Sequence, residues 1–356
     1  MTDFRTTPHL SVRVPVLRRN IEGMARFAAG RGMALRPHAK THKSLDVARL
    51  QVAAGARGLT VATLGEAEVF ARGGFGDLFV AYPLWLDDVK ARRMRALLDV
   101  AELRLGVDSV EGARRMAAAA GADASRLRVR VEVDSGHHRS GTTPARAGEV
   151  AAAAAGAGLA VEGVFTFPGH GYGPGNAARA AADESAALSA ARDAVLAEGL
   201  PCPVLSGGST PTAHHASGSP ATELRPGVYV FNDAQQLESG TCGEEAVALT
   251  AVCTVVGSRG GTVLVDAGSK VLGADRPAWT SGFGRVAGHP LARVVALSEH
   301  HATIDWGTSL PVPVAGDLLR VIPNHVCNAV NLVDELVASE DGFDAIWPVH
   351  ARGRNS

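Results

Sequence analysis

Short apolar runs alternate with longer Ala-rich stretches of helical spacing over the first two thirds of the chain. Strands that alternate with helices in this way pair in parallel through right-handed crossovers. Eight such units predict a (β/α)8 barrel of the TIM type, and hence an α/β fold. The apolar runs are Met33–Pro37, Leu59–Thr63, Asp77–Ala81, Glu102–Val107, Leu127–Val133, Val161–Phe167, Pro203–Ser206 and Gly227–Phe231. An open doubly wound sheet is the alternative, but it does not need eight units, and no GxGxxG follows the first strand.

The pattern changes after about residue 235, where short apolar runs are separated by Gly, Pro and Asp. Runs such as Ala248–Val256 and Leu318–Ile322 predict a C-terminal, mainly β domain. The stretch Leu10–Val14 also alternates and is expected to add a strand to that domain. We therefore expect an N-terminal segment over residues 1–15 that joins the β domain, a barrel over 16–235, and the β domain over 236–356.

Composition and charge narrow the class of protein. The 356 residues carry a formal net charge of -1 without a basic block, which argues against nucleic-acid binding. No apolar stretch is long enough to cross a membrane, and the first residues lack the apolar region of a signal peptide. Four cysteines without a CxxC motif indicate no disulfide framework. A globular, cytoplasmic protein is the expectation.

Lysine usage draws attention to the end of the first predicted strand. Only four of the 35 basic residues are lysines, and Lys40 lies in the segment RPHAKTHKS, beside His38 and His42. Catalytic residues of barrels cluster where strands end, and a partly desolvated lysine amine is nucleophilic and can form an imine. A structural ion-pair lysine is the competing interpretation.

Other strand ends carry further polar residues. The fifth predicted strand leads to Arg139, and the sixth to His170 and Tyr172. The seventh ends in SGGSTPT, a small-residue loop that contains Ser206, Gly207, Gly208, Ser209 and Thr210. Backbone amides in such a loop can hold a phosphate, and barrels often bind phosphate at this position. An ordinary Gly-rich turn is the alternative. A lysine together with a phosphate site meets the needs of pyridoxal phosphate.

The segment PNHVCNAVNL near the C-terminus pairs His325 with Cys327. In an extended segment, side chains two residues apart face the same way. Imidazole and thiolate together suit Zn2+, with water or substrate in the remaining coordination positions. An isolated buried cysteine is the competing interpretation.

Together these motifs resemble the fold-type III pyridoxal-phosphate enzymes, in the branch of D-serine dehydratase and D-threonine aldolase. The resemblance implies that Lys40 binds the cofactor and that Arg139 approaches its phenolic oxygen. It also implies cofactor binding by Tyr229 and the SGGST loop, metal binding by His325 and Cys327, and a homodimer. The motifs run nearly the whole length of the chain: RPHAKTHKS, EVDSGHHRSG, SGGSTPT, ELRPGVYVFND, VDAGSKVL, PNHVCNAVNL and WPVHARGR.

The resemblance leaves two lyase reactions open. Dehydratases of the branch have His-x-Cys at the metal, whereas many D-threonine aldolases have a carboxylate after the cysteine, where this chain has Asn328. A D-serine dehydratase-like enzyme using pyridoxal phosphate and Zn2+, or another divalent metal, is therefore expected, with retro-aldol cleavage as the alternative. His38, His42, His170 and Tyr172 are candidate bases. Remoter alternatives are a barrel zinc hydrolase and a non-catalytic cofactor carrier.

Overall fold

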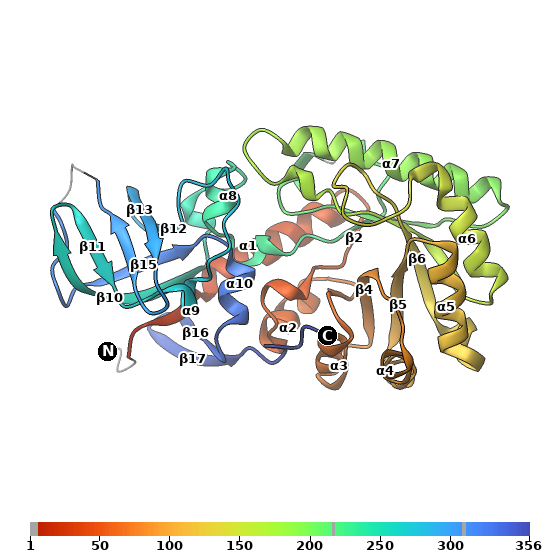
Figure 1. The fold of residues 1–356 in the computed structure, drawn as a ribbon, viewed down its shortest axis with the longest axis horizontal. Coiled ribbons are helices and arrows are strands. Elements are labelled where there is room, and N and C mark those ends of the chain that lie inside the picture. Colours follow the sequence, from red (N-terminus) through yellow and green to blue (C-terminus); the bar gives the residue numbers. More distant parts are fainter. Residues whose placement is uncertain (1–5, 216–217, 308–310) are drawn as a thin grey trace. The chain divides into compact units, whose positions relative to one another are not determined.

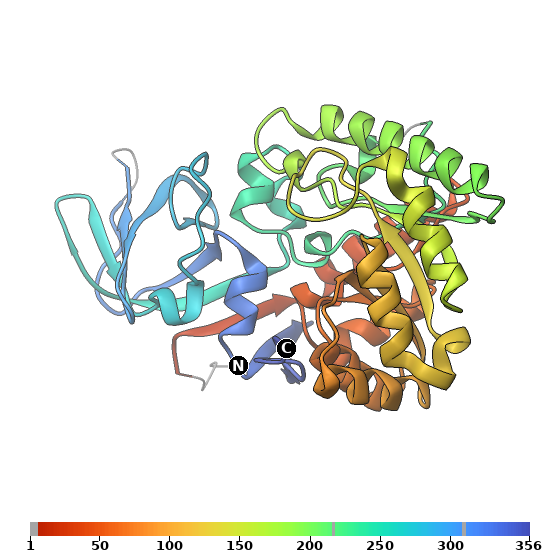
Figure 2. The same cartoon turned by 45° about the vertical axis from the view of Figure 1, so that its right-hand side comes forward.

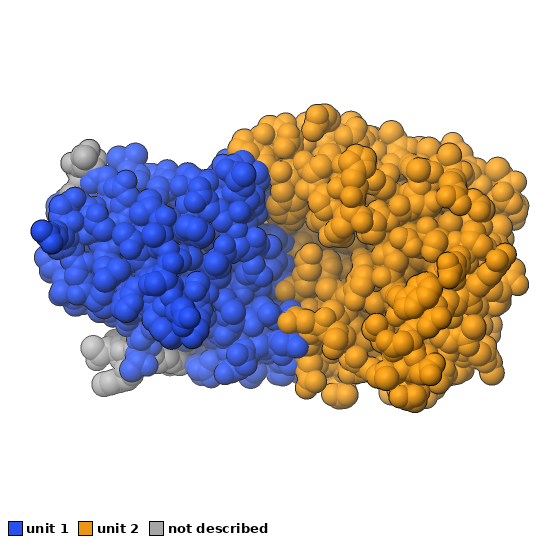
Figure 3. Space-filling view, in the orientation of Figure 1, with its two compact units in different colours: residues 1–23, 41–50, 228–353 blue, residues 24–40, 51–227, 354–356 orange. Residues whose placement is uncertain are grey.

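The computed structural model describes residues 6–215, 218–307 and 311–356. These residues divide into two compact units (Figure 3), each described by itself below. One unit comprises residues 24–40, 51–227 and 354–356 and contains the parallel sheet. The other comprises residues 1–23, 41–50 and 228–353 and contains the mainly antiparallel sheet.

The first unit is built on an eight-stranded sheet in which every paired strand is parallel. The strand order is β2-β9-β8-β7-β6-β5-β4-β3, and a parallel bridge between His38 and Thr60 joins the two ends. The strands are β2 (Ala34–Leu35), β3 (Leu59–Val61), β4 (Asp77–Pro83), β5 (Glu102–Val107), β6 (Arg128–Glu132), β7 (Ala160–Phe165), β8 (Val204–Gly207) and β9 (Glu223–Leu224). The predicted (β/α)8 barrel is thereby confirmed.

Helices follow most of these strands and cover the outside of the sheet (Figure 1). Several begin at a residue whose side chain accepts a backbone N–H of the first turn, as Thr63, Asp87 and Ser109 do. The helices of the chain are α1 (Val14–Ala29), α2 (Leu45–Ala53), α3 (Leu64–Arg72), α4 (Asp88–Leu98), α5 (Val110–Ala120), α6 (Ala147–Gly156), α7 (Ala177–Ala197), α8 (Ala234–Glu238), α9 (Ser269–Leu272) and α10 (Val326–Asn331).

The eighth predicted strand is wrong in position. Residues Gly227–Phe231 were expected to be extended because apolar residues crowd there, but Val228–Val230 form a 3-10 turn. The strand is β9, which ends two residues before Pro226. Proline has no N–H to donate to a sheet and therefore marks the end of pairing.

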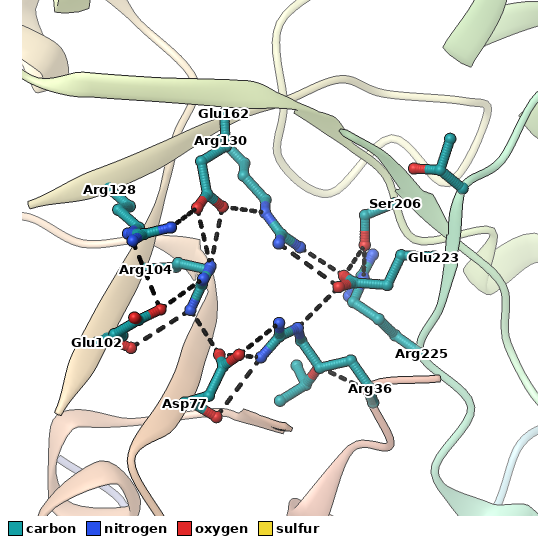
Figure 4. A network of polar contacts seen from close by, with 12 residues as sticks. Arg36, Asp77, Glu102, Arg104, Arg128, Arg130, Glu162, Ser206, Glu223 and Arg225 are labelled. Carbon is teal, nitrogen blue, oxygen red and sulfur yellow. Dashed lines mark hydrogen bonds and ion pairs between the residues drawn. The ribbon is translucent and has the colours of Figure 1, made fainter. Parts of the chain in front are cut away.

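Ion pairs fill much of the barrel interior (Figure 4). Glu223 on β9 accepts Nε of Arg36 at 2.8 Å and Nη1 of Arg130 at 2.5 Å, and all three side chains are buried. Arg104 links Asp77 at 2.5 Å to Glu162 at 2.8 Å. In most TIM barrels branched apolar side chains occupy this space. Here paired charges do so instead, and the buried Arg36, Arg104 and Arg130 each have a carboxylate partner.

The second unit contains a nine-stranded sheet in the order β11-β14-β13-β12-β15-β10-β1-β16-β17. An additional pairing of β11 with β10 closes six of these strands into a small barrel (Figure 1, Figure 2). The N-terminal strand β1 pairs antiparallel with β10 and parallel with β16. The strands are β1 (His9–Arg13), β10 (Leu249–Arg259), β11 (Thr262–Val265), β12 (Gly284–Val286), β13 (His289–Leu297), β14 (Ala302–Asp305), β15 (Leu318–Pro323), β16 (Glu335–Glu340) and β17 (Phe343–Pro348).

The predicted C-terminal, mainly β domain is confirmed by this sheet. The domain boundaries at residues 15 and 235 stay predictions. None of the helices in the described part of the chain combines the length and apolar character needed to cross a membrane.

Candidate active site

Lys40 lies in a 3-10 turn, Ala39–Thr41, just after the first barrel strand. The chain leading to it runs beside β3, because the N–H of Thr60 donates to the carbonyl of Pro37 at 2.8 Å. The N–H of Lys40 itself donates to Nδ1 of His38 at 3.4 Å. The imidazole of His38 therefore fixes the turn from which the lysine side chain projects.

A cavity of about 590 Å³ lies at the carboxyl ends of the barrel strands, and its volume is that of a small-molecule site. Phe167 provides an aromatic ring near both cations of this region, with its centroid 5.6 Å from Lys40 Nζ and 5.2 Å from the guanidinium carbon of Arg139. The cavity is lined by His38, Lys40, Ala62, Thr63, Ala81, Tyr82, Pro83, Asp108, Arg139 and Ser140. Three predicted site residues thus share one cavity.

A tight turn after β6 positions Arg139. Asp134 accepts the backbone N–H of Gly136 at 2.9 Å and that of His138 at 3.0 Å. Its second carboxylate oxygen contacts Nδ1 of His138 at 2.6 Å. Burial opposes ionisation of Asp134, but these hydrogen bonds hold its pKa below the usual value. The turn is therefore built around an ionised aspartate.

Glu132, the last residue of β6, lies behind the cavity wall and was missed by the sequence analysis. Its Oε1 accepts the hydroxyl of Ser140 at 3.1 Å, while Oε2 is buried without a hydrogen-bond partner in the described structure. Burial raises the pKa of Glu132 to about 7, although Ser140 and Arg139 favour the charged form. The alternation of VEVD along a barrel strand was the available signal that this carboxylate points inward.

His170 and Tyr172 are absent from the described lining of this cavity. His170 lies in the 3-10 turn Gly169–Gly171, where Nε2 contacts Asp183 Oδ2 at 3.1 Å. Its Nδ1 is buried and has no hydrogen-bond partner among the residues described. The ring of Tyr172 has its centroid 6.3 Å from that of Phe167. Tyr172 therefore borders the aromatic ring of the site, and neither residue belongs to the described lining of the cavity.

The SGGST segment begins in β8, whose last two residues are Ser206 and Gly207, and continues as a buried loop. Gly208 adopts a φ of +81°, which favours glycine, and Ser209 and Thr210 are almost completely buried. The N–H of Ser209 donates to Oγ1 of Thr212 at 2.9 Å. Ser206 has a different role, because its hydroxyl donates to Glu223 at 2.7 Å and accepts Nε of Arg225 at 2.8 Å. Ser206 thus belongs to the ion-pair network of the barrel.

A second residue missed by the sequence analysis, Glu184, lies against this loop. The carboxylate comes from α7 and accepts the N–H of Gly208 at 2.5 Å. A Cβ on Gly207 would lie 2.1 Å from Glu184 Oε1, so a larger residue there would displace the Glu184 carboxylate. Burial raises the pKa of Glu184 to about 7, against the opposing effects of the Gly208 N–H and Arg225. A titratable carboxylate therefore lies beside the predicted phosphate site.

In the other unit, Tyr229 is buried within the 3-10 turn Val228–Val230. Asp233, four residues later, is fully buried and caps two helices. It accepts the N–H of Gln236 at 3.0 Å and that of Val326 at 3.1 Å. His42 is also fully buried, and its Nδ1 accepts the N–H of Ser44 at 3.1 Å. The contacts with Gln236 and Ser44 are local, whereas the contact of Asp233 with Val326 joins residues that are 93 apart in the chain.

His325 and Cys327 lie at the start of α10, so the expectation of an extended segment is wrong. The extended backbone ends at His325, and Cys327 is the second helical residue. The sulfur of Cys327 lies 3.3 Å from the hydroxyl oxygen of Thr41. Nδ1 of His325 hydrogen-bonds Oδ2 of Asp275. Burial lowers the pKa of His325, but Cys327 and Asp275 outweigh it and raise the pKa to about 11.

The described residues contain no cluster of three or more His, Cys, Asp or Glu that would enclose a metal ion. The donor pair still suits an open metal site. Imidazole and thiolate are zinc ligands, and catalytic zinc leaves coordination positions to water or substrate. The residues present therefore fit a metal held by two protein donors.

Comparison with known proteins gives the family. The alanine racemase N-terminal domain matches residues 12–235, and the putative serine dehydratase domain matches residues 248–339. D-threo-3-hydroxyaspartate dehydratase of Delftia sp. is 36% identical, with 90% of each chain covered. The chain belongs to the fold-type III pyridoxal-phosphate enzymes.

Other members of this family agree in sequence and structure. The 3-hydroxy-D-aspartate aldolase of Paracoccus denitrificans is 31% identical and covers 98% of this chain, which in turn covers 92% of it. The structure of D-threonine aldolase from Filomicrobium marinum matches with a TM-score of 0.88 at 29% identity, covering 98% of this chain and 96% of its own. The resemblance inferred from the motifs is confirmed, and so is the prediction of a pyridoxal-phosphate-dependent lyase.

The site fits the cofactor of the family. Lys40 offers an amine inside a cavity of suitable volume, and Arg139 offers a cation in the same cavity. The buried loop of Gly208, Ser209 and Thr210 offers small residues and hydroxyls of the kind that hold a phosphate. These residues are therefore chemically suited to pyridoxal phosphate, the cofactor of the family.

Proposed function

We propose that this protein is a pyridoxal-phosphate- and zinc-dependent dehydratase of D-β-hydroxy amino acids. It would convert the substrate into a 2-oxo acid and ammonia, as in D-serine to pyruvate. The observation that carries the proposal is the placement of Lys40, His38 and Arg139 around one cavity in a chain of this family. The Delftia relative, a dehydratase by name, supports the reaction type.

Two groups of residues would hold the cofactor. Lys40 would bind its aldehyde, and Gly207, Gly208, Ser209 and Thr210 would hold its phosphate, with Tyr229 as a further contact. Arg139 would donate to an oxygen of the ring. When bound, pyridoxal phosphate supplies an electron sink that makes the Cα proton of an amino acid acidic. The Lys40 amine then takes that proton.

His325 and Cys327 would hold the metal. Thiolate and imidazole favour Zn2+ over Mg2+ or Ca2+, which prefer oxygen donors. When bound, zinc supplies a Lewis acid for the β-hydroxyl of the substrate. A structure of a D-threo-3-hydroxyaspartate dehydratase with a cysteine replaced by alanine is described as the metal-free form, which supports metal binding in a related enzyme.

Proton transfers beyond Lys40 need a second group. His38 lines the cavity, which makes it the best placed of the predicted bases. His170 has a buried, unpartnered Nδ1 within the described structure but contacts Asp183 through Nε2. Tyr172 borders Phe167. His38 and His42 both accept a backbone N–H through Nδ1, but His42 is absent from the described lining of the cavity. We therefore assign the second proton transfer to His38.

Retro-aldol cleavage to glycine and an aldehyde is the second candidate reaction. The Paracoccus and Filomicrobium relatives, both aldolases by name, favour it. Asn328 argues for dehydration, because it lacks a carboxylate that could bind a hard metal ion beside the β-hydroxyl. The homodimer and the cytoplasmic location also stay predictions.

The proposal is tested by ammonia release from a set of substrates. Purified protein with pyridoxal phosphate and Zn2+ would be given D-serine, D-threonine, D-threo-3-hydroxyaspartate and their L-enantiomers, with D-alanine as the control that lacks a β-hydroxyl. We expect ammonia from at least one D-β-hydroxy amino acid, from none of the L-enantiomers and not from D-alanine. Removal of the metal by a chelator should abolish release, and re-addition of Zn2+ should restore it. Ammonia from D-alanine would contradict the proposal.

A further inference from the structure

His325 makes a hydrogen bond that the predicted metal site does not explain. Its Nδ1 contacts the Oδ2 carboxylate oxygen of Asp275, which lies 50 residues earlier in the chain. Asp275 follows α9, in a segment with no predicted role. A histidine that binds a metal through one ring nitrogen commonly donates the other N–H to a carboxylate. The contact therefore has the chemistry of an orienting hydrogen bond.

The backbone around Asp275 holds this carboxylate in place. The carbonyl of Asp275 accepts Nδ2 of Asn324, the residue before His325, at 2.7 Å. Gly273, with a φ of +74°, lies so close to α10 that a Cβ would be 3.2 Å from the Cβ of Asn328. Helices α9 and α10 are also in contact. Two contacts thus restrain Asp275 beside the His325 imidazole: the hydrogen bond of its own carbonyl and the packing of the preceding segment against α10.

The start of α10, which follows His325, is held by a separate hydrogen bond. Asp233 accepts the N–H of Val326 at 3.1 Å, which holds the start of α10. Nδ1 of His325 is already taken by Asp275, so Nε2 is the ring nitrogen left to bind a metal. The two ring nitrogens point in diverging directions. A carboxylate on Nδ1 therefore cannot reach an ion held by Nε2.

We propose that Asp275 is the positioning residue of this site. Its carboxylate accepts the Nδ1–H of His325 and so presents Nε2, together with the sulfur of Cys327, to a zinc ion. This inference rests on the metal site of the proposed function. Because the carboxylate selects the tautomer and makes Nε2 a stronger donor, its loss is expected to weaken metal affinity by about 10- to 100-fold.

The test measures Zn2+ affinity of the full-length, metal-stripped protein by competition with a chromophoric chelator of known affinity. Asp275→Ala should weaken binding within that range, and Asp275→Asn should weaken it less, because an amide oxygen still accepts the Nδ1–H. Asp334→Asn changes an exposed aspartate of the same unit and should leave the affinity unchanged. Cys327→Ala identifies the signal that belongs to this site.

A second readout reports the tautomer directly. In Zn2+-loaded protein labelled with 15N-histidine, with His325→Gln identifying the signal, His325 should keep its proton on Nδ1, and this preference should be lost in Asp275→Ala. A wild-type affinity that Cys327→Ala does not change would overturn the metal site itself. An affinity that depends on Cys327 but is equal in wild type and Asp275→Ala would overturn only the role of Asp275.

Discussion

Glu184 accepts the backbone N–H of Gly208 at 2.5 Å, inside the loop proposed to hold the cofactor phosphate. The group is fully buried, and burial raises its pKa to about 7. Arg225 is the charged side chain that acts on it, and it favours the ionised form. Glu184 is therefore expected to change charge near neutral pH, next to the proposed phosphate site.

This relationship predicts a pH dependence of cofactor affinity. Below about pH 7 Glu184 is neutral, whereas above it the carboxylate repels the phosphate. Glu184→Gln should therefore tighten binding of pyridoxal phosphate at pH 8, on the order of tenfold, and change it little at pH 6. Absorbance titration of the cofactor-free enzyme measures both. Glu198→Gln, an exposed glutamate after the same helix, is the control. Equal gains at both pH values would contradict the prediction.

Lys40 is predicted to attach the cofactor covalently. Lys40→Ala should remove the visible absorption of the lysine-bound cofactor and abolish ammonia release, because no other lysine lines the described cavity. Lys90→Ala alters a partly exposed lysine on α4 and should retain both properties. Cofactor absorption that persists in Lys40→Ala after dialysis would show that a different residue carries the cofactor.

Replacement of Cys327 tests whether turnover, and not only cofactor binding, depends on the proposed metal site. Cys327→Ala should keep the cofactor absorption but lose turnover by at least about 100-fold, since the metal that activates the β-hydroxyl would bind poorly. Absorbance and ammonia release on the same sample test this. Cys253→Ala replaces a buried cysteine of the same unit and controls for loss of a thiol. Turnover that survives in Cys327→Ala would exclude a metal role for the cysteine.

The ion pairs in the barrel predict a stability change. Burial favours the neutral form of Glu223, but Arg130 and Arg36 outweigh it and hold its pKa at about 2. Glu223→Gln leaves these two guanidinium groups buried and under-neutralised, at a cost of about 3–5 kcal/mol in the free energy of unfolding. Urea denaturation of the variant and of Glu299→Gln, which alters an exposed residue, measures the difference. A loss below about 1 kcal/mol would refute the assigned role.

The ion pairs of Glu223 also predict how acid changes the stability of the protein. The pKa of Glu223 is depressed in the folded state relative to its usual value of 4.5. Its contribution to stability is therefore present above about pH 4.5 and is lost as the pH falls towards 2. In wild type the free energy of unfolding should fall over this interval more steeply than in Glu223→Gln.

The sequence predicted those features that depend on local pattern. Alternation of apolar runs with helical stretches was enough for the barrel, and the spacing of motifs was enough for the family. The position of the last strand was missed because Gly227–Phe231 is as apolar as a strand, although Pro226 ends the pairing before it. The helix at Cys327 was missed because His325 and Cys327 were interpreted as an isolated pair.

Contacts between distant residues could not be predicted from pattern. Asp275 and His325 are 50 residues apart, and nothing local marks Asp275 as the acceptor. Glu184 lies in an Ala-rich helix, and its burial follows from the packing of α7 against Gly207 and Gly208, which the sequence pattern does not indicate. The charged barrel interior likewise depends on residues from several strands that meet only in the folded sheet (Figure 4).

Product analysis with D-threonine tests the central proposal most directly, because dehydration and retro-aldol cleavage can both act on it. Purified protein, pyridoxal phosphate and Zn2+ would be incubated with D-threonine and the mixture followed by proton NMR. We predict 2-oxobutanoate and ammonia in equal amounts. Glycine and acetaldehyde in their place would contradict dehydration and assign the chain to the aldolases.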